Sequence, residues 1–203
     1  MIDRVRYFFG VVNVVVVSLG LLYWLAIHQW ARWWRTWGPT RTYLVVLPVL
    51  TALGVSLYAV RDQLLGADLG TNWSLIGVSL VLSCGSTLLE LQTWRQLTIA
   101  TLVGIPELSR QPNGKLLRDG IYGVIRHPRY LSAGIGLGAS VLFVNYLGLY
   151  VLVVCVLPLG YVMLALEERE LLDRFGEAYE EYRRDVPRLT PRWRKRPSQT
   201  PRP

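Results

Sequence analysis

The sequence has little of the chemistry on which disulfide frameworks and metal centres depend. It contains two cysteines and two histidines among 203 residues. Cys84 and Cys155 both lie in apolar stretches, so we expect them to be buried as small apolar side chains rather than to form a disulfide. Neither a second histidine nor a cysteine lies near His127 in the sequence. We therefore predict no metal site.

Charged residues are also scarce, whereas apolar residues are abundant. Asp, Glu, Lys and Arg make up 18% of the chain and hydrophobic residues 52%, which is more apolar than an ordinary soluble domain. The net charge of +8 alone could indicate nucleic-acid binding. The basic residues flank long apolar runs, however, and this pattern is typical of membrane proteins that contact anionic headgroups. We predict no nucleic-acid partner.

The apolar runs predict an all-α, polytopic integral membrane protein with about five transmembrane helices. Several runs approach the roughly 20 apolar residues that cross a bilayer. The first run resembles a signal peptide, but it is long for one and lacks a small-residue cleavage site, so we favour a retained span. The expected spans are residues 7–27, 43–60, 73–97, 130–145 and 147–166. The expected regions are 1–97 (three N-terminal spans), 98–193 (cofactor-binding catalytic region with a hairpin) and 194–203 (disordered basic tail).

Arginine in the short loops predicts the orientation. Arg32, Arg35 and Arg41 follow the first span, and the 98–129 connection and the C-terminal tail are basic. The positive-inside rule then places the C-terminus in the cytosol and the N-terminus outside, although Arg4 and Arg6 oppose this. We expect a plasma (inner) membrane location, with the functional site on the cytosolic side.

The most informative polar segment lies just before the fourth span. A loop containing Gly120 and Gly123 leads into Arg126-His127-Pro128. Proline is favoured in the first turn of a helix, so Arg126 and His127 should lie at a helix start, which favours an anion. A lone histidine is often structural, but the position of His127 between two arginines at a membrane boundary favours a functional role.

Acidic residues mark three further positions. Glu167 and Glu168 follow span five, and a hairpin of spans four and five would bring them to the same membrane face as Arg126 and His127. They could bind a cationic group or serve only as solvated anchors, and the sequence leaves both open. Glu90 lies inside span three, where a charge is costly. We expect it to face a cavity, the interface or Arg95.

Two patterns have competing interpretations. Gly134-Ile-Gly-Leu-Gly138-Ala139 matches a dinucleotide-binding fingerprint, but no strand precedes it. We instead expect Gly134 and Gly138 to allow close approach of a helix, with span five as the candidate. The apolar stripe of the tail predicts a helix that either lies on the surface, which we favour, or closes a pocket over residues 117–125. Its members are Leu171, Phe175, Tyr179, Tyr182 and Val186.

Four blocks occur in the order found in a known superfamily. They are Gly120-Ile-Tyr122, Arg126-His-Pro-Arg-Tyr130, Glu167-Glu168, and residues 175–187. Residues 94–193 resemble the isoprenylcysteine carboxyl methyltransferase and phospholipid methyltransferase superfamily. The resemblance implies a membrane enzyme that uses S-adenosylmethionine in a pocket at the cytosolic face.

The resemblance also implies residue roles. His127 and Tyr130 would bind the methionine moiety, and Glu168 its amino group. Arg126 and Glu167 would shape the reacting end. The backbone of 117–125, including Leu117, Gly120 and Tyr122, would line the adenosine.

The acceptor stays open, because the sequence departs from the family at Val103–Leu108, where relatives are more aromatic. We expect a lipophilic acceptor, with a prenylcysteine-type carboxylate favoured and a phospholipid amine as the alternative, and the sequence also leaves a small thiol open. Membrane lipids would be the other partners. Rival hypotheses are an NADPH-dependent protein related to sterol reductases and a non-catalytic membrane protein. The sequence assigns no oligomeric state.

Overall fold

The computed structural model describes residues 1–97 and 116–191, and every regular element in them is helical. The expectations for Val103–Leu108 and for the tail at 194–203 lie outside these residues. The elements are α1 (Ile2–Gln29), α2 (Ala31–Trp37), α3 (Pro39–Ala59), α4 (Arg61–Leu65), α5 (Trp73–Trp94), the 3₁₀ helix η1 (Gly120–Gly123), α8 (Pro128–Val144), α9 (Leu147–Phe175) and α10 (Glu177–Asp185). The predicted all-α class is confirmed. The predicted burial of Cys84 and Cys155 is wrong, because both are exposed on the outer faces of apolar helices α5 and α9.

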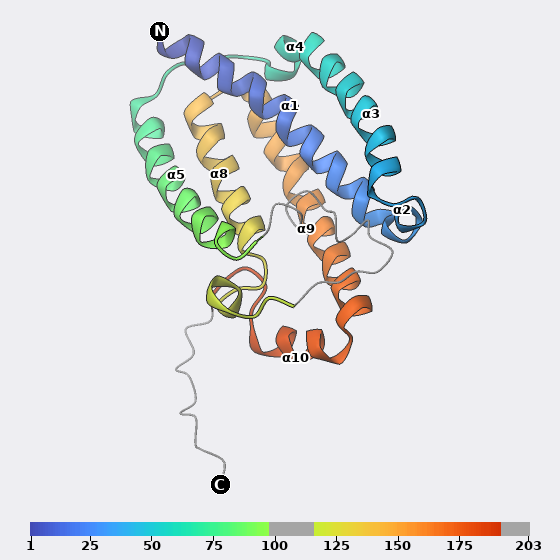
Figure 1. Cartoon of the computed structure of the whole chain (residues 1–203). Coiled ribbons are helices and arrows are strands. Elements are labelled where there is room, and N and C mark those ends of the chain that lie inside the picture. Colours follow the sequence, from blue (N-terminus) through green and yellow to red (C-terminus); the bar gives the residue numbers. More distant parts are fainter. Residues whose placement is uncertain (98–115, 192–203) are drawn as a thin grey trace.

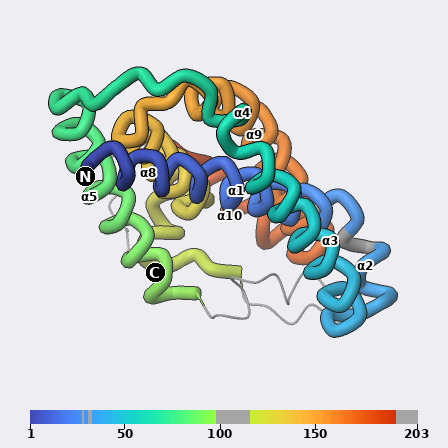
Figure 2. Tube along the Cα trace, turned by 90° about the horizontal axis from the view of Figure 1, so that it is seen from above, coloured from blue at the N-terminus to red at the C-terminus, as the bar shows by residue number. Residues whose placement is uncertain are grey.

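The long helices form a bundle in which segments distant in sequence are neighbours. α5 packs along α8, while α1 packs against α9, α3 and α8. Viewed from above, α1 runs across the bundle between α5 and α3 (Figure 2). The N-terminus and α4 lie at one end, and η1 and α10 lie at the other (Figure 1). The N-terminal and C-terminal parts of the chain therefore share one helical assembly.

Local sequence signals explain where the helices begin and end. Pro39 and Pro128 each occupy the first turn of a helix, where the missing N–H costs no hydrogen bond. The Asn72 side chain caps α5 by accepting from the N–H groups of Ser74 and Leu75. Asn145 ends α8 in the left-handed region at φ 54°, a conformation that asparagine tolerates. The α8–α9 hairpin follows from this short turn.

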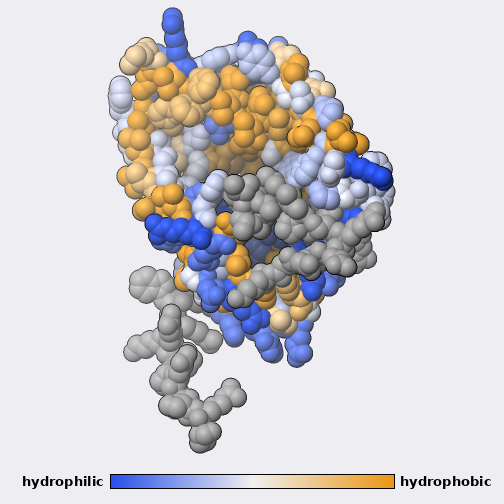
Figure 3. Space-filling model, in the orientation of Figure 1, coloured by the Kyte–Doolittle hydropathy of each residue, from blue (hydrophilic) through white to orange (hydrophobic). Residues whose placement is uncertain are grey.

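Four helices in the described part of the chain are long and apolar enough to cross a membrane: α1, α3, α5 and α9. α8, with 17 residues, is a shorter apolar helix of about 26 Å, against a hydrocarbon core of about 30 Å. In Figure 3, hydrophobic residues dominate the upper part of the visible face and polar residues the lower end. The apolar helices support an integral membrane protein, with α8 as the fifth and shortest member.

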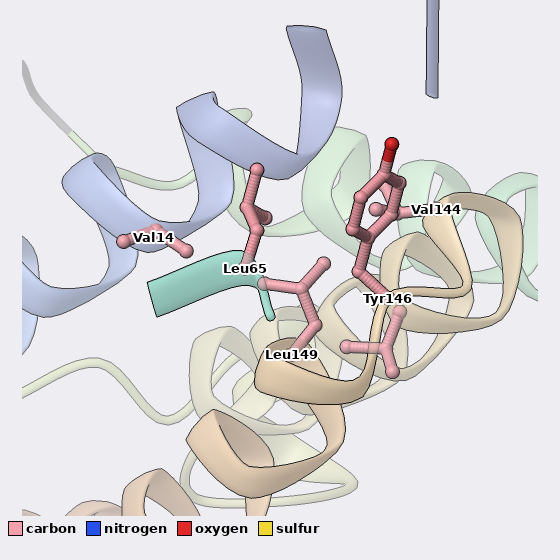
Figure 4. Packing of buried hydrophobic residues seen from close by; sticks show 6 residues of the cluster. Val14, Leu65, Val144, Tyr146 and Leu149 are labelled. Atoms are coloured by element: carbon pink, nitrogen blue, oxygen red, sulfur yellow. The ribbon is translucent and has the colours of Figure 1, made fainter. Parts of the chain in front are cut away.

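A compact apolar cluster holds the end of the bundle that carries the hairpin turn. Its buried members include Leu65 of α4, Val144 at the end of α8, and Leu149 of α9 (Figure 4). Val144 and Leu149 are completely buried. Val14 of α1 belongs to the same cluster, so burying these side chains together fixes the α8–α9 turn against α1 and α4.

The C-terminal half of the bundle differs from the prediction in one respect. Span five was expected to end at Leu166, but α9 continues as one helix to Phe175, carrying Glu167 and Glu168 on its extension. Gly176, at φ 55°, then turns the chain into α10. The predicted apolar stripe is therefore divided between two helices, and its tyrosines Tyr179 and Tyr182 are buried on α10.

The close helix contact predicted at Gly134 and Gly138 is wrong. A Cβ at either position would meet no described atom within 4 Å, whereas a Cβ at Gly136 would lie 2.9 Å from Ser86 Oγ of α5. The small residue that matters is Gly136, and the neighbour is α5 rather than span five. Glycine spacing identified the helix but not the face that packs.

We expect Gly136→Leu to lower the thermal unfolding midpoint of the protein in detergent and Gly138→Leu to leave it nearly unchanged. Leucine at 136 would force α5 and α8 apart, and overpacking costs about 1–3 kcal/mol. Both variants gain the same helix propensity, so they form a matched pair. Equal midpoints for the two variants would contradict the close contact at Gly136.

Candidate functional site

A buried polar cluster joins the start of α8 to the extension of α9. His127 Nε2 lies 3.1 Å from Glu168 Oε1, and Arg126 Nη2 lies 3.2 Å from the same oxygen. His127 is 4% exposed and Glu168 5% exposed. A carboxylate removed from water in this way needs cationic or hydrogen-bonding partners, and these two residues supply them.

A third cation reaches the same carboxylate from the chain that follows α10. Arg188 Nε donates to Glu168 Oε1 at 3.2 Å, and Arg188 Nη2 pairs with Oε2. The backbone N–H groups of Arg126 and His127 donate to the carbonyls of Pro187 and Arg188 at 2.9 and 3.1 Å. Residues 186–188, called the strap below, are thus bonded directly alongside the Arg126-His127 segment.

α10 packs over the loop at 117–125. The hydroxyl of Tyr182 donates to the carbonyl of Tyr122 at 2.6 Å, and Arg118 donates to the carbonyl of Ala178. Arg118 also lies over the Tyr182 ring. α10 buries only Tyr179 and Tyr182, so it lies on the surface of the protein as the favoured prediction has it. The part of the protein that it covers is the loop named in the other interpretation.

Three tyrosines around the cluster are kept in their neutral form. Burial raises the pKa of Tyr179 above its usual range, and Glu168 adds to the effect while Arg126 opposes it. Burial also raises the pKa of Tyr182 to about 12. Burial raises the pKa of Tyr122, which Arg129 opposes and Glu167 reinforces. Each phenol is therefore available as a hydrogen-bond donor at neutral pH.

Three buried donor atoms of the cluster have no hydrogen-bond partner within the part of the chain that the structure describes. Nε and Nη1 of Arg126 are unpaired, and so is the hydroxyl of Tyr179. The Arg126 side chain is 8% exposed and Tyr179 is 1% exposed. Because unpaired buried donors are rare and costly, this group of N–H and O–H donors fits an anionic acceptor such as a carboxylate.

Two further carboxylates, Glu90 and Glu167, lie near Tyr122. Glu90 accepts from the hydroxyl of Ser132 on α8 and, at 2.6 Å, from Trp94 Nε1. Of the three surroundings expected for Glu90, the Arg95 pairing is not found among the described contacts, in which Ser132 and Trp94 are the partners. Glu167 is half-buried and makes no hydrogen bond or ion pair within residues 1–97 and 116–191. Glu90 and Glu167 both raise the pKa of Tyr122, so the three residues are close enough to interact electrostatically.

The structure brings most of the predicted site residues to one end of the bundle. Arg126, His127 and Glu168 are in direct contact, and the Tyr130 ring lies 5.7 Å from the His127 ring. Gly120 begins η1 at φ 55° beside the Gln96 side chain, a conformation that glycine adopts without strain. Leu117 lies just before η1. The described residues contain no group of side chains suited to a metal ion.

None of the sequence motifs pointed to Arg188 or to the hydroxyl of Tyr179 as part of the cluster. Both follow Gly176, and no periodicity in the sequence shows that the chain folds back there towards α8. One signal was present: Pro187 cannot continue a helix, and it favours an extended residue before it. An extended strap after α10 could have been predicted from it, but not the ion pair with Glu168.

The chain is 33% identical over 79 residues to the protein-S-isoprenylcysteine O-methyltransferase of Schizosaccharomyces pombe. The matched segment is 38% of this chain and 34% of that protein, so the chain spans about a third of the relative's length. No family model matches the chain. No solved structure matches it either.

Proposed function

We propose that the protein is a membrane methyltransferase that uses S-adenosylmethionine and acts on a lipophilic acceptor, with a prenylcysteine-type carboxylate favoured. The observation that carries the proposal is the buried Arg126–His127–Glu168 cluster with its unpaired donors, at the end of an apolar hairpin. The similarity to the yeast methyltransferase supports the same activity.

The residues present fit the methionine part of this cofactor. Its carboxylate would accept from Arg126 Nε and Nη1 and from the Tyr179 hydroxyl, which are the unpaired buried donors. Charge-assisted hydrogen bonds of this kind are among the strongest in proteins. Glu168 would bind the ammonium, while His127 and Tyr130 would border the chain of the amino acid.

The other proposed contacts concern the adenosine of the cofactor and the end of the cofactor that carries the reactive methyl group. The backbone around Leu117, Gly120 and Tyr122 would line the adenosine, and the packing of α10 on this loop would keep it in place. Arg126 and Glu167 would shape the reacting end.

The cofactor supplies a methyl group already activated by its sulfonium, so the protein's task is to orient and to exclude water. A carboxylate acceptor is nucleophilic at neutral pH and needs no base. A phospholipid amine must first lose a proton. Glu167, which makes no hydrogen bond or ion pair within the described ranges, is the candidate base for it. Because Glu167 could serve as this base, a phospholipid amine is the second candidate acceptor.

We propose that the cluster and the C-terminus face the cytosol, at the plasma (inner) membrane. The three arginines after α1 and the basic C-terminal segment support this orientation. The test is to replace Ser198 with cysteine and label intact cells with an impermeant reagent. Protection until the cells are permeabilised is the expected result, and labelling from outside contradicts the orientation.

Binding and turnover test the function. We expect the purified protein to bind S-adenosylhomocysteine but not NADPH in calorimetry. Given radiolabelled S-adenosylmethionine, it should methylate prenylcysteine analogues in preference to amines of a total lipid extract. Binding of NADPH alone would support the reductase hypothesis, and binding of neither ligand would refute the cofactor assignment. Label in lipid amines alone would favour the second acceptor.

A further inference from the structure

The partners of Glu168 are distributed unequally between its two oxygens. Oε1 accepts from His127, Arg126 and Arg188 Nε, so its lone pairs are fully used. Oε2 has only Arg188 Nη2 as a partner within the described residues. Any cation that binds Glu168 must therefore approach Oε2, where it meets the Arg188 guanidinium.

The three donors also differ in how easily they can leave. The side chain of His127 is 3% exposed and that of Arg126 8% exposed, whereas that of Arg188 is 33% exposed. A buried arginine separated from its carboxylate would lose its charge compensation, whereas a partly exposed one can be solvated by water. Of the three partners of Glu168, Arg188 is thus the one whose separation from the carboxylate costs the least free energy.

Arg188 has a second set of partners on α9. Its Nη1 donates to the Tyr161 hydroxyl at 3.1 Å, and its guanidinium lies 5.4 Å from the centre of the Tyr161 ring. The backbone of the strap is held separately by the N–H groups of Arg126 and His127. The side chain can therefore turn from Glu168 towards Tyr161 while the strap stays in place.

We propose that Arg188 competes with the ammonium of the cofactor's methionine moiety for Glu168 Oε2, and so sets the affinity for amino-acid-bearing ligands. The inference rests on the proposed function, and it concerns a residue that the cofactor assignment does not use. The exchange replaces one cation by another, so Glu168 keeps its charge balance. The hydrogen bond to Glu168 raises the pKa of Arg188, which agrees with a tight pair that a ligand must break.

The test compares two ligands in three proteins by calorimetry. The ligands are S-adenosylhomocysteine and its analogue without the α-amino group. The proteins are the wild type, Arg188→Gln, and the control Arg183→Gln, which removes an exposed arginine of α10 whose ion-pair partner within the described residues is Glu180. Each protein's thermal midpoint is measured first, so that only folded samples are compared.

We expect Arg188→Gln to bind S-adenosylhomocysteine about tenfold more tightly than the wild type, which is the effect of removing one competing charged hydrogen bond. The deaminated analogue should bind both proteins equally, and Arg183→Gln should match the wild type. Weaker binding in Arg188→Gln, or equal tightening for both ligands, overturns the competition. Absence of binding in all three proteins refutes the proposed function and the competition together.

Discussion

Glu168→Gln is expected to weaken S-adenosylhomocysteine binding by about tenfold to a hundredfold. The amide keeps the shape of the side chain but removes the charge that Arg126 and Arg188 share. It also removes the acceptor proposed for the cofactor ammonium. Breaking one partner of a buried ion pair costs about 3–5 kcal/mol, so the free energy of unfolding should fall as well.

The matched control lies two residues further along the same helix. Glu170 pairs with Arg35 of α2, and its side chain is 10% exposed. Glu170→Gln should reduce stability but leave ligand affinity within about twofold, because this ion pair joins α9 to α2 rather than to the cluster. Calorimetry on folded protein in detergent measures the affinity, and thermal unfolding measures the stability. Equal affinities in Glu168→Gln, Glu170→Gln and the wild type would contradict the site assignment.

The helices could be predicted from the sequence because their signals are local. Apolar runs, Pro128 in a first helical turn and the short connection at Asn145 each act within a few residues. The packing partners could not be predicted in the same way. Gly136 contacts Ser86 of α5, and the choice between faces of α8 depends on where α5 lies, which spacing within α8 does not encode.

The residues of the candidate site also differ in whether they could be predicted from the sequence. Arg126, His127 and Glu168 were expected at one membrane face because a hairpin places the ends of two adjacent spans together, and the structure brings them into contact. Their cofactor roles remain proposals. Arg188 could not be anticipated, since its contact with Glu168 depends on the turn at Gly176 and on the strap that returns to α8.

Arg6 shows a different limit of sequence reasoning. In the sequence it opposes the predicted orientation, because it looks like a loop charge beside the first span. In the structure it is completely buried. It donates to the carbonyl of Val144 at 3.0 Å and to Asp3 and Thr71 at 3.1 Å, and it pairs with Asp68. An arginine used in this way is a structural residue. It should therefore count less when the membrane orientation is inferred from the charges of the loops.

We expect Arg6→Met to lower the free energy of unfolding by about 3 kcal/mol, at the low end for a broken buried ion pair. Methionine fills much of the space but donates no hydrogen bond, so the end of α8 and the segment at 68–71 lose their common partner. The cost is not larger, because the side chains of Asp3 and Asp68 are 68% and 40% exposed and can be solvated. Chemical unfolding in detergent measures the loss.

Arg4→Met is the control, since Arg4 is two residues away and exposed, and it should leave stability within about 0.5 kcal/mol of the wild type. Arg6→Lys should fall between the two, because one ammonium cannot reach Val144, Asp3 and Asp68 together. Ligand affinity should be unchanged in folded Arg6→Met, because Val144 and Pro128 lie at opposite ends of α8, about 25 Å apart. A wild-type unfolding midpoint in Arg6→Met would show that the buried guanidinium does not hold this end of the bundle together.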